Sequence, residues 1–501
     1  MSEKQTKAEH RGIPVTDEFR AYIASGWAPR DESAPPRAAV ADFAAARREA
    51  LSAAYPGERL VIPAGGLKVR SNDCDYAFRP HSAFAHLTGL GADREPDAVL
   101  VLEPLEGGGH EAILYFRPAS GKDTDEFFLD SRYGEFWVGA RPTLASTQAE
   151  LGLTTRDLTR FETEVGKDVG AVALRVVRDA DASVAAIVDA ARASVELTGV
   201  GAQERLASQL EADQELARRL STMRLCKDAW EVDQMRQACA ATATAFEAVV
   251  AELPEAIRRG RGERWIEGTF NRTARHAGNG VGYESICAAA DHANTLHWIR
   301  NTGDVHDGDL VLLDAGIEMD SLFTADITRT LPANGRFTDA QRRVYDAVYA
   351  AQCAGIAAIR PGATFKDVHA AAIRVIAETL HDWGMLPEGA TVEESLDPEK
   401  GQWHRRWMVH GTSHHLGIDV HDCALALRED YMDGELRPGM ILTVEPGLYF
   451  KSDDLLVPQE LRGIGVRIED DVLVTDDGHE ILSPQLPRAS ADVEAWMARL
   501  L

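Results

Sequence analysis

The sequence lacks the features that mark membrane, secreted and nucleic-acid-binding proteins. It contains no run of about 18 or more apolar residues, so no membrane-spanning helix is expected. The opening residues, MSEKQTKAEHRGIPV, include no apolar segment of the kind that a signal peptide needs. Basic residues are few, because 53 Lys and Arg accompany 80 Asp and Glu and the formal net charge is −27. Neither a nucleic acid nor a membrane is therefore a predicted partner.

Cysteine is rare and scattered, and several catalytic motifs are missing. No two cysteines form a CxxC pair, which argues against a disulfide framework or a zinc ribbon. Without a secretory signal, a reducing cytoplasm is the expected location. The chain has no HExxH, GxxxxGKS/T or GxSxG motif, so these zinc, nucleotide and serine-hydrolase chemistries are not predicted. The six cysteines are Cys74, Cys226, Cys239, Cys287, Cys353 and Cys423.

The length of 501 residues predicts two or three domains. Residues 1–36 are polar and contain Ala-Pro-Arg and Ala-Pro-Pro, so we expect an extended or partly ordered arm. Residues 37–202 combine short apolar strands with helices and predict an α/β domain of ordinary size. Residues 203–222 are highly charged with helical spacing, which indicates a linking helix. Residues 223–501 place acids within apolar strands between helices and predict an α+β domain.

Hydrophobic spacing and capping residues predict the individual elements. In the first domain we expect helices at 37–55 and 183–196, and strands at 59–64, 97–104, 112–118 and 171–177. In the second domain, capping boxes begin helices at Asp228–Glu231, Thr338–Gln341 and Thr364–Asp367. The first of these helices is expected to run to about residue 252. The segment 385–408 is a long loop for a compact domain, and such loops are often functional.

Two acids interrupt the apolar stretch LVLLDAGIEMDSLFTADITRT. Asp314 follows four apolar residues, and Asp326 lies in an alternating run. A three-residue turn at 319–321 would pair Glu318 with Leu322 and place the two acids directly opposite each other. Opposed Cβ atoms lie about 4.5–5.5 Å apart, where like charges destabilise a strand pair. Either a cation lies between the carboxylates, or one acid is exposed at a strand end; this stretch alone leaves both interpretations open.

Two further acids and a histidine cluster favour the cation. The apolar strand ILTV is followed by Glu445, and IGVRIED places Arg467 and Glu469 on one face. Between the two pairs of acids lies VHGTSHHLGIDVHD. Burying carboxylates without partners costs several kcal/mol each, so four acids in apolar strands indicate cations or protons. The histidines of this segment are His410, His414, His415 and His421.

The donor set indicates the type of metal. Carboxylate oxygens with one or two imidazoles and no thiolate suit Mn, Fe, Co or Zn, and disfavour a structural zinc site. Four carboxylates carry a charge of −4, which matches two divalent ions. Two ions ~3.5–4 Å apart activate a water molecule and polarise a carbonyl group. The pattern therefore predicts hydrolysis.

The ordered motifs DAG…DITRT, HGTSHHLGIDVH, TVEPGLY and GVRIED closely resemble the pita-bread metallopeptidases, which include aminopeptidase P, prolidase and methionine aminopeptidase. This resemblance covers 223–501. RSNDCDYAFRPHSAFAHLTGL at 70–90 is similar to the N-terminal domain of aminopeptidase P and its prolidase relatives, which methionine aminopeptidases lack. The chain is therefore most similar to aminopeptidase P. The resemblance implies an α/β aminopeptidase P-type N-terminal domain at 37–202 and an α+β pita-bread catalytic domain.

The resemblance also implies five ligands for two divalent metal ions, usually Mn(II), with Co(II), Zn(II) and Fe(II) as alternatives. Asp326 and Glu469 would bridge the two ions. Asp314 would complete one ion, and His414 and Glu445 would complete the other. Glu445 would in addition carry a proton to the leaving nitrogen.

Other residues match family positions around the substrate. His421 would contact the reacting carbonyl group, and His297 and His410 would position the substrate and move protons. Arg467 would hold a bridging carboxylate or a group of the substrate. His415 is expected to be an ordinary residue, because the family motif places the ligand at the first histidine of the pair.

Three features depart from the plainest family pattern or have a weaker role. The interval from Asp314 to Asp326 is one residue longer than expected for bacterial aminopeptidase P, which puts the turn in question. ICAAADHANTLHW is an unusual form of its motif, and His292 within it is a second candidate. His404 is expected to be a surface residue of the loop 385–408.

The implied function is release of the first residue from peptides that have proline in the second position. The alternative is a prolidase, which cuts only Xaa-Pro dipeptides, and the core motifs barely separate the two. A metal-free binding module is a third interpretation, which the complete ligand set disfavours. The resemblance further implies a homodimer or homotetramer formed partly through the N-terminal domain.

Overall fold

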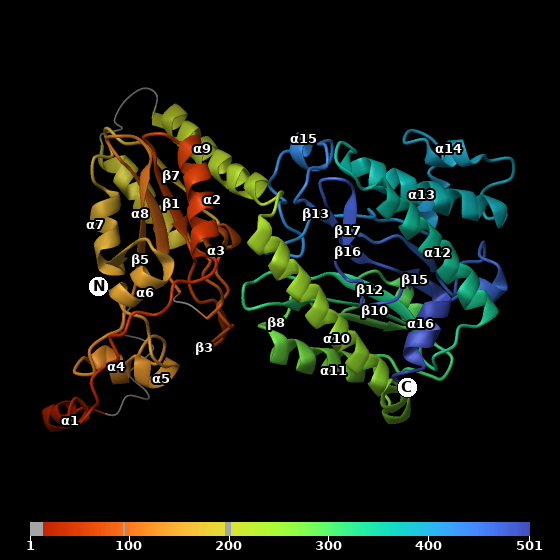
Figure 1. Ribbon diagram of the computed structural model, residues 1–501, viewed down its shortest axis with the longest axis horizontal. Coiled ribbons are helices and arrows are strands. Elements are labelled where there is room, and N and C mark those ends of the chain that lie inside the picture. Colours follow the sequence, from red (N-terminus) through yellow and green to blue (C-terminus); the bar gives the residue numbers. More distant parts are fainter. Residues whose placement is uncertain (1–13, 94–95, 196–201) are drawn as a thin grey trace. The chain divides into compact units, whose positions relative to one another are not determined.

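The computed structural model describes residues 14–93, 96–195 and 202–501, so the first 13 residues of the expected arm lie outside the described part (Figure 1). The chain divides into an N-terminal unit of residues 1–88 and 94–209 and a C-terminal unit of residues 89–93 and 210–501. The division falls inside the charged helix α9 (Ala202–Met223), which matches the expected linking helix. Within the described ranges, the model contains no helix with the length and apolar character that a membrane span requires.

A five-stranded mixed sheet forms the core of the N-terminal unit, in the order β6-β5-β4-β1-β7. The neighbours β1 and β4 are antiparallel, whereas β1 and β7 are parallel. The central strands β1 and β4 are largely apolar on both faces because helices α2 and α3 cover one face and α7 and α8 cover the other (Figure 1). The sheet strands are β1 (Arg59–Pro63), β4 (Val99–Pro104), β5 (His110–Phe116), β6 (Thr154–Asp157) and β7 (Leu174–Val176).

The elements expected for this unit are present. The four predicted strands are confirmed as β1, β4, β5 and β7, and the two predicted helices as α2 and α8. The described part of the arm contains one short helix, α1, whose N-cap is the side chain of Thr16. A small hairpin joins β2 (Val69–Ser71) and β3 (Cys74–Asp75). The helices are α1 (Asp17–Ile23), α2 (Ala41–Ala54), α3 (Ser82–Thr88), α4 (Asp125–Leu129), α5 (Glu135–Val138), α6 (Leu144–Leu151), α7 (Phe161–Val165) and α8 (Ala182–Ser194).

A buried carboxylate, Glu164, ties α7 to the sheet. The Tyr115 hydroxyl donates to it at 2.6 Å, Arg156 donates a second hydrogen bond, and Arg160 forms an ion pair at 2.6 Å. Burial opposes ionisation of Glu164, but these partners outweigh it and lower its pKa from the ordinary 4.5 to about 2. Glu164 therefore stabilises the fold while it is ionised.

This network predicts an acid-dependent loss of stability. Because the folded pKa is below the unfolded value, the contribution is complete above pH 4.5 and is lost as the pH falls towards 2. We expect Glu164→Gln to lower the midpoint urea concentration at pH 7, and expect its difference from wild type to shrink between pH 5 and pH 3. Glu162→Gln, an exposed change on the same helix, is the control. A difference that stays constant across this pH range would contradict the assignment.

The C-terminal unit places short antiparallel ladders between two pairs of helices (Figure 1). Helices α10 and α11 pack together and contact β8, β9 and β11, whereas α12 and α13 pack together and α12 contacts β13, β14 and β15. The ladders have the orders β12-β10-β9, β11-β8, β13-β16-β17 and β14-β15. The strands are β8 (Gly280–Val281), β9 (Ile286–Ala289), β10 (Leu310–Ala315), β11 (Ile317–Glu318), β12 (Ile327–Pro332), β13 (Ile441–Val444), β14 (Gly447–Phe450), β15 (Ile464–Arg467), β16 (Asp470–Val474) and β17 (His479–Ile481).

The three predicted capping boxes are confirmed at the starts of α10, α12 and α13. The expected end of the first helix near residue 252 was wrong, because α10 continues through Pro254. Leu253 and Ala256 are both fully buried, so packing of the apolar face continues past the proline. The helices are α10 (Ala229–Arg259), α11 (Gly262–Ala277), α12 (Asp339–Ala358), α13 (Phe365–Asp382), α14 (Val392–Leu396), α15 (Arg428–Tyr431) and α16 (Ser490–Met497).

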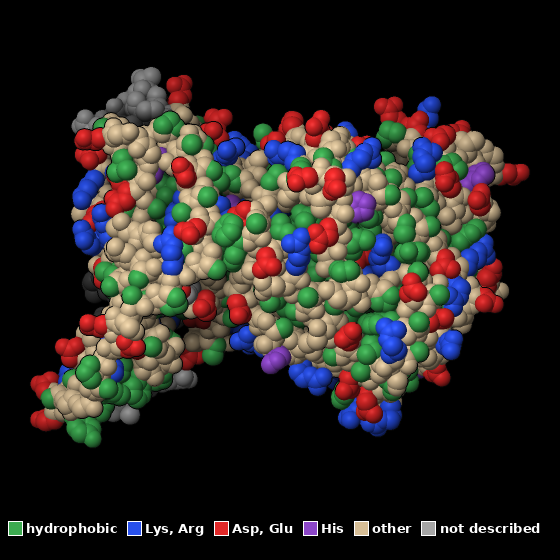
Figure 2. Space-filling view, viewed as in Figure 1, with side chains coloured by type: hydrophobic (Ala, Val, Ile, Leu, Met, Phe, Trp, Pro, Cys, Tyr) green, Lys and Arg blue, Asp and Glu red, His purple; other side chains and the backbone are tan. Residues whose placement is uncertain are grey.

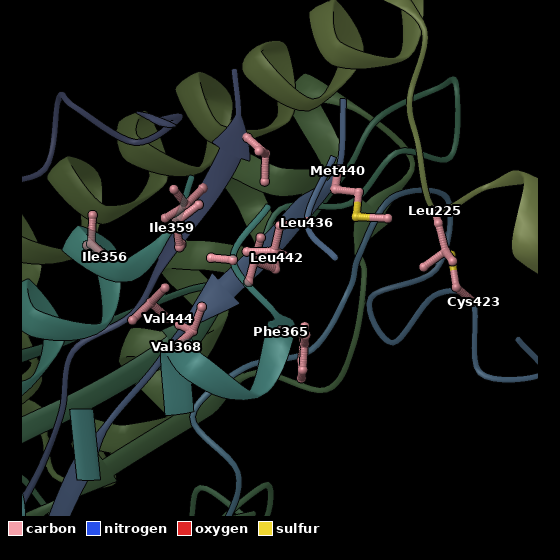
Figure 3. Close-up of a cluster of buried hydrophobic side chains, with 13 residues drawn as sticks. Leu225, Ile356, Ile359, Phe365, Val368, Cys423, Leu436, Met440, Leu442 and Val444 are labelled. Atoms are coloured by element: carbon pink, nitrogen blue, oxygen red, sulfur yellow. The ribbon is translucent and has the colours of Figure 1, made fainter. Parts of the chain in front are cut away.

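An apolar cluster packs α12 and α13 against one face of the β13-β16 ladder (Figure 3). Leu442 and Val444 of β13 contact Ile356 of α12 and Val368 of α13 within this cluster, and all four are at most 4% exposed. Such packing holds β13 rigidly. The strand therefore presents Glu445, the residue that follows it, from a fixed position.

The surface of the C-terminal unit is of mixed charge. On the face shown in Figure 2, Lys and Arg side chains are interspersed with Asp and Glu side chains over this unit. The Lys and Arg side chains on the visible face of this unit therefore do not form a basic patch.

Candidate metal centre

All nine residues predicted for the catalytic and metal site line one cavity of the C-terminal unit, with a volume of about 540 Å³. The acids come from strand ends: Asp314 lies in β10, Asp326 directly precedes β12, and Glu445 directly follows β13. Glu469 lies between β15 and β16. The cavity also contains His297, His410, His414, His421 and Arg467.

The expected register of the first pair of acids was wrong by two residues. Asp314 lies opposite Thr328 rather than Asp326, and Glu318 lies opposite Thr324 rather than Leu322. The turn is centred on Ser321, because Leu322 N–H donates to Met319 O at 2.8 Å and Met319 N–H donates to Phe323 O at 3.0 Å. Leu322 adopts the left-handed φ of +72° that the third residue of such a loop requires. A shift of two residues preserves the side-chain face, so both acids still point into the cavity.

Asp326, His414 and Glu469 form the centre of the site. One ligand atom from each of the three lies within 4.8 Å of the others. His414 Nε2 is 3.3 Å from Asp326 Oδ2 and 3.7 Å from Glu445 Oε1. Glu469 is 2% exposed and accepts a 2.6 Å hydrogen bond from Thr328 Oγ1. Thr328 belongs to β12, the strand that directly follows Asp326. This strand therefore also orients the Glu469 carboxylate.

Glu445 lies between two histidines. Its backbone N–H donates to Thr412 O at 2.9 Å, which attaches it to the segment that carries His410 and His414. Its Oε2 atom is 3.7 Å from His410 Nδ1. His410 Nε2 in turn is 2.7 Å from the Tyr449 hydroxyl. This arrangement forms a polar wall on one side of the cavity.

Arg467 is the cation of the centre. Its Nη2 atom donates to Asp314 Oδ2 at 2.5 Å, and its Nη1 atom donates to the Tyr449 hydroxyl at 3.1 Å. Arg467 thus pairs with Asp314, the acid that the resemblance assigns to a single ion, whereas the expected contacts were a bridging carboxylate or a group of the substrate. Arg467 is 4% exposed, so this pair is held away from water.

The carboxylates carry more negative charge than this arginine balances. Burial raises the pKa of Glu469 well above its usual range, and the neighbouring acids raise it further. Burial also raises the pKa of Asp314, although Arg467 opposes this effect. Burial raises the pKa of Glu445 to about 7, against the opposing charges of His414 and Arg467. In each case the cause is an anion removed from water beside other anions.

The histidines of the cavity have different surroundings. Burial alone would lower the pKa of His414, but the hydrogen bond and charge of Asp326, together with Glu445, raise it to about 9. Burial and the nearby Arg467 lower the pKa of His410 to about 4. His421 stacks edge-to-face on His414 at 4.4 Å, and the partial burial of its ring lowers its pKa although the residue as a whole is exposed. His297 and His421 are exposed at the mouth of the cavity.

The cluster fits divalent metal ions. It offers three buried carboxylates and the half-buried Glu445 beside the imidazole of His414, with no thiolate among the described residues that line the cavity. Such oxygen and nitrogen donors suit Mn, Fe, Co or Zn. Within the described cavity only Arg467 and the histidines offset the carboxylate charge, so divalent ions would stabilise the ionised acids.

Two tyrosines belong to the site and were not predicted. The Tyr283 hydroxyl donates to Asp314 Oδ1 at 2.8 Å and also contacts Asp326. Tyr449 connects His410 with Arg467. Tyr449 lies inside the TVEPGLY motif, which marks it, whereas the sequence around Tyr283 carries no comparable signal.

A buried carboxylate behind the site was also missed. Asp471 Oδ2 accepts hydrogen bonds from the Asp326 backbone N–H at 3.0 Å and from Cys239 Sγ at 3.3 Å. Asp471 is fully buried, so it holds the backbone of Asp326 from outside the cavity.

The other three histidines considered in the sequence, His292, His404 and His415, do not line the metal cavity. His415 is 1% exposed, stacks on Phe365 and makes no contribution to the cavity lining, as expected for an ordinary residue. His292 is bound to Glu263 at 2.7 Å and stacks on Trp298, outside the cavity. The expected surface position of His404 was wrong: it is 6% exposed, because its ring packs inside the loop and bonds Ser395 Oγ at 3.1 Å.

Comparison with known families identifies both halves of the chain. Residues 233–476 match the model of metallopeptidase family M24, and residues 44–174 match the aminopeptidase P N-terminal domain. The two-domain order expected from the motifs, an α/β domain followed by a pita-bread domain, is therefore confirmed.

Individual relatives extend over almost the whole chain. Xaa-Pro aminopeptidase 2 of Streptomyces coelicolor is 49% identical over 97% of this chain and 97% of its own length. Xaa-Pro aminopeptidase 1 of the same organism is 50% identical over 100% of this chain and 96% of its own length. A substrate complex of Escherichia coli aminopeptidase P superimposes with a TM-score of 0.78 at 30% identity, covering 93% of this chain and 99% of that chain. The chain is therefore a peptidase that belongs to metallopeptidase family M24, in the branch that carries an aminopeptidase P N-terminal domain.

Proposed function

We propose that this protein is a two-metal aminopeptidase that releases the first residue of peptides with proline in the second position. The observation that carries the proposal is the cluster of three buried carboxylates and the half-buried Glu445 around His414 in one cavity. The names of the relatives from Streptomyces coelicolor support the proline specificity and favour it over the prolidase alternative.

The ligand assignment that we propose is the one that the family resemblance implies, and the clustering of its residues supports it. Asp326 and Glu469, at the centre of the cluster, would be shared by both ions. Asp314 would complete one ion, and His414 and Glu445 the other. Two divalent ions supply an activated water molecule and polarise the reacting carbonyl group. We propose Mn(II), with Co(II), Zn(II) and Fe(II) as alternatives, because the donors are oxygen and imidazole nitrogen.

The chain's own residues would guide the substrate and its protons. Exposed at the mouth, His297 and His421 are placed to contact the peptide, and we assign His421 to the carbonyl oxygen. Glu445 would pass a proton to the leaving nitrogen, because it lies beside His410 and His414 at the cavity wall. Arg467 and Tyr283 hold Asp314 in place.

Substrate specificity tests the proposal. The leaving group is the tertiary amide nitrogen of proline, which carries no N–H. We expect chromatography of Arg-Pro-Pro digests to show free arginine with Mn(II) and none after chelation. Arg-Ala-Pro, which has proline in the third position, is the matched control and should stay intact.

Two outcomes would redirect the assignment. Cleavage of Ala-Pro without cleavage of any Xaa-Pro-Yaa tripeptide would identify a prolidase. Equal cleavage of Arg-Pro-Pro with and without chelator would contradict the metal-dependent mechanism.

We further propose a homodimer or homotetramer in the cytoplasm. Adjoining aromatic side chains on the N-terminal unit support self-association: Trp27 and Phe136 both pack on Phe127, with ring centroids 5.6 and 5.8 Å apart, and are 44% and 60% exposed. Exposed aromatic groups of this kind mark interaction surfaces. Light scattering after gel filtration is expected to give at least twice the chain mass, and a monomer would contradict this part of the proposal.

A further inference from the structure

A second cavity of about 1000 Å³ adjoins the metal centre within the C-terminal unit. Its walls are α13, residues 393–405 of the loop 385–408, and the segment 408–411. The volume is at the upper end of the range for ligand pockets. None of the nine predicted site residues except His410 contributes to its lining.

The two cavities share a narrow ridge. His410 and Gly411 line both of them. Gly411 is exposed, and a Cβ built on it would meet only Ser413 O, at 3.9 Å. Gly411 therefore presents only backbone atoms beside the His410 ring, and an extended peptide can pass over this ridge.

Internal hydrogen bonds order the part of the loop that forms one wall of this cavity. His404 is buried and its Nδ1 and backbone N–H both bond Ser395 Oγ, at 3.1 and 3.2 Å. Arg374 of α13 also forms an exposed ion pair with Glu393 of α14 at 2.7 Å, across the cavity. The wall is therefore ordered mainly by the buried His404–Ser395 contacts.

One wall residue offers a directed hydrogen-bond donor. His369 Nδ1 accepts from the Thr412 backbone N–H at 3.3 Å, which leaves the proton on Nε2. This Nε2 atom has no hydrogen-bond partner in the described part of the chain, and His369 lines the cavity. Such a group can donate to a peptide carbonyl oxygen.

The direction of the substrate follows from Glu445. If Glu445 delivers the proton to the leaving nitrogen, that nitrogen lies within hydrogen-bond reach of it. His410 is 3.7 Å from Glu445, so the leaving chain begins beside His410. From there the second cavity opens on the other side of the Gly411 ridge.

We propose that the second cavity binds the residues of the substrate that follow the second-position proline, so that peptides of about five or more residues are preferred over tripeptides. This inference rests on the proposed aminopeptidase function. An extended chain advances about 3.3–3.6 Å per residue, so each further residue carries the chain deeper into the cavity and adds contacts that a tripeptide lacks. The occupant is thus the downstream peptide rather than a separate ligand.

Filling the cavity tests the proposal. Ala371 and Ala370 of α13 line it, and neither belongs to the core. We expect Ala371→Trp to lower kcat/KM for Arg-Pro-Pro-Ala-Ala-Ala about tenfold, equivalent to 1.4 kcal/mol, and to change kcat/KM for Arg-Pro-Pro less than twofold. Ala370→Trp, at an exposed position, should show the same selectivity if Ala371→Trp fails to fold. Glu378→Trp, exposed on the same helix outside the cavity, is the control.

Inhibition by the leaving peptide gives an independent measurement. With Arg-Pro-Pro as the substrate, wild-type enzyme is expected to be inhibited at least fivefold more strongly by Pro-Ala-Ala-Ala-Ala than by Pro-Ala, neither of which has proline in the second position, and Ala371→Trp is expected to remove this difference. Equal loss of activity on both substrates, or no length dependence in wild type, would overturn the second-cavity proposal while leaving the proposed function intact. Failure of wild type to cleave Arg-Pro-Pro would instead overturn the proposed function, and this inference with it.

Discussion

Asp326→Asn is expected to lower kcat for Arg-Pro-Pro by at least about 1000-fold. Asp326 lies at the centre of the cluster, 3.3 Å from His414 and in contact with Tyr283, and it is the proposed shared ligand. Asparagine keeps the shape but removes the charge, so it weakens the contribution of both ions. Metal ions supply several kcal/mol of transition-state stabilisation, and each 1.36 kcal/mol is tenfold in rate. The loss is measured by release of arginine at saturating Mn(II).

The control for this variant lies in the same hairpin. Asp320→Asn changes an exposed acid of the turn and should retain wild-type activity. Circular dichroism of both variants checks that the fold is kept. Activity within tenfold of wild type in Asp326→Asn would remove this residue from the centre of the mechanism.

Arg329→Met is expected to destabilise the C-terminal unit by about 3–5 kcal/mol, because it removes the nearest cation from the buried Asp470, which keeps hydrogen bonds from Gln352 and Ser483 and a longer 3.8 Å contact with Arg488. Arg329 is fully buried and binds Asp470 at 2.7 Å, Glu469 O at 2.6 Å and Pro487 O at 2.9 Å. It thus joins β12 to β16 directly behind the metal centre. We expect the thermal midpoint to fall by roughly 10 °C.

A surface ion pair provides the comparison. Arg236 binds Glu480 at 2.6 Å, but both side chains are more than 40% exposed. Arg236→Met should therefore change the thermal midpoint little, since exposed pairs contribute less than about 1 kcal/mol. Equal effects of the two substitutions would show that Arg329 does not act through burial of its charge.

The sequence predicted the parts of the fold that local chemistry determines. Capping boxes such as Asp228–Glu231 mark helix starts because the cap satisfies backbone N–H groups within one turn. The apolar strands of the N-terminal sheet were found for a similar reason, since burial on both faces requires continuous apolar runs. The end of α10 was missed, because packing of Leu253 and Ala256 outweighed the local effect of Pro254.

The acids of the site were predicted from the sequence. Contacts of these acids with residues distant in sequence were missed. Four acids stand out in the sequence because burying a charge within an apolar strand costs free energy unless a partner compensates it. They are Asp314, Asp326, Glu445 and Glu469. The predicted register of the hairpin was wrong by two residues, because the sequence does not show that Leu322 adopts a left-handed backbone conformation. Tyr283 reaches the acids from a segment 31 and 43 positions away, a contact that only the folded chain defines.

His404 shows the same limit on a smaller scale. A polar residue in a long loop is normally exposed, but this ring is buried because Ser395, nine positions earlier, supplies its hydrogen bond. The loop has structure of its own, with α14 and a short turn of 3₁₀ helix at Trp403–Arg406. Its part as a cavity wall follows from packing against α13, which the sequence does not state.

Metal stoichiometry tests the central claim most directly. Metal-free protein would be titrated with Mn(II) by isothermal calorimetry, and arginine release from Arg-Pro-Pro would be measured at each ratio. The five-ligand centre predicts saturation at two ions per chain, with activity rising to its maximum as the second ion binds. Full activity with no bound metal ion, or saturation without any gain in activity, would contradict the account.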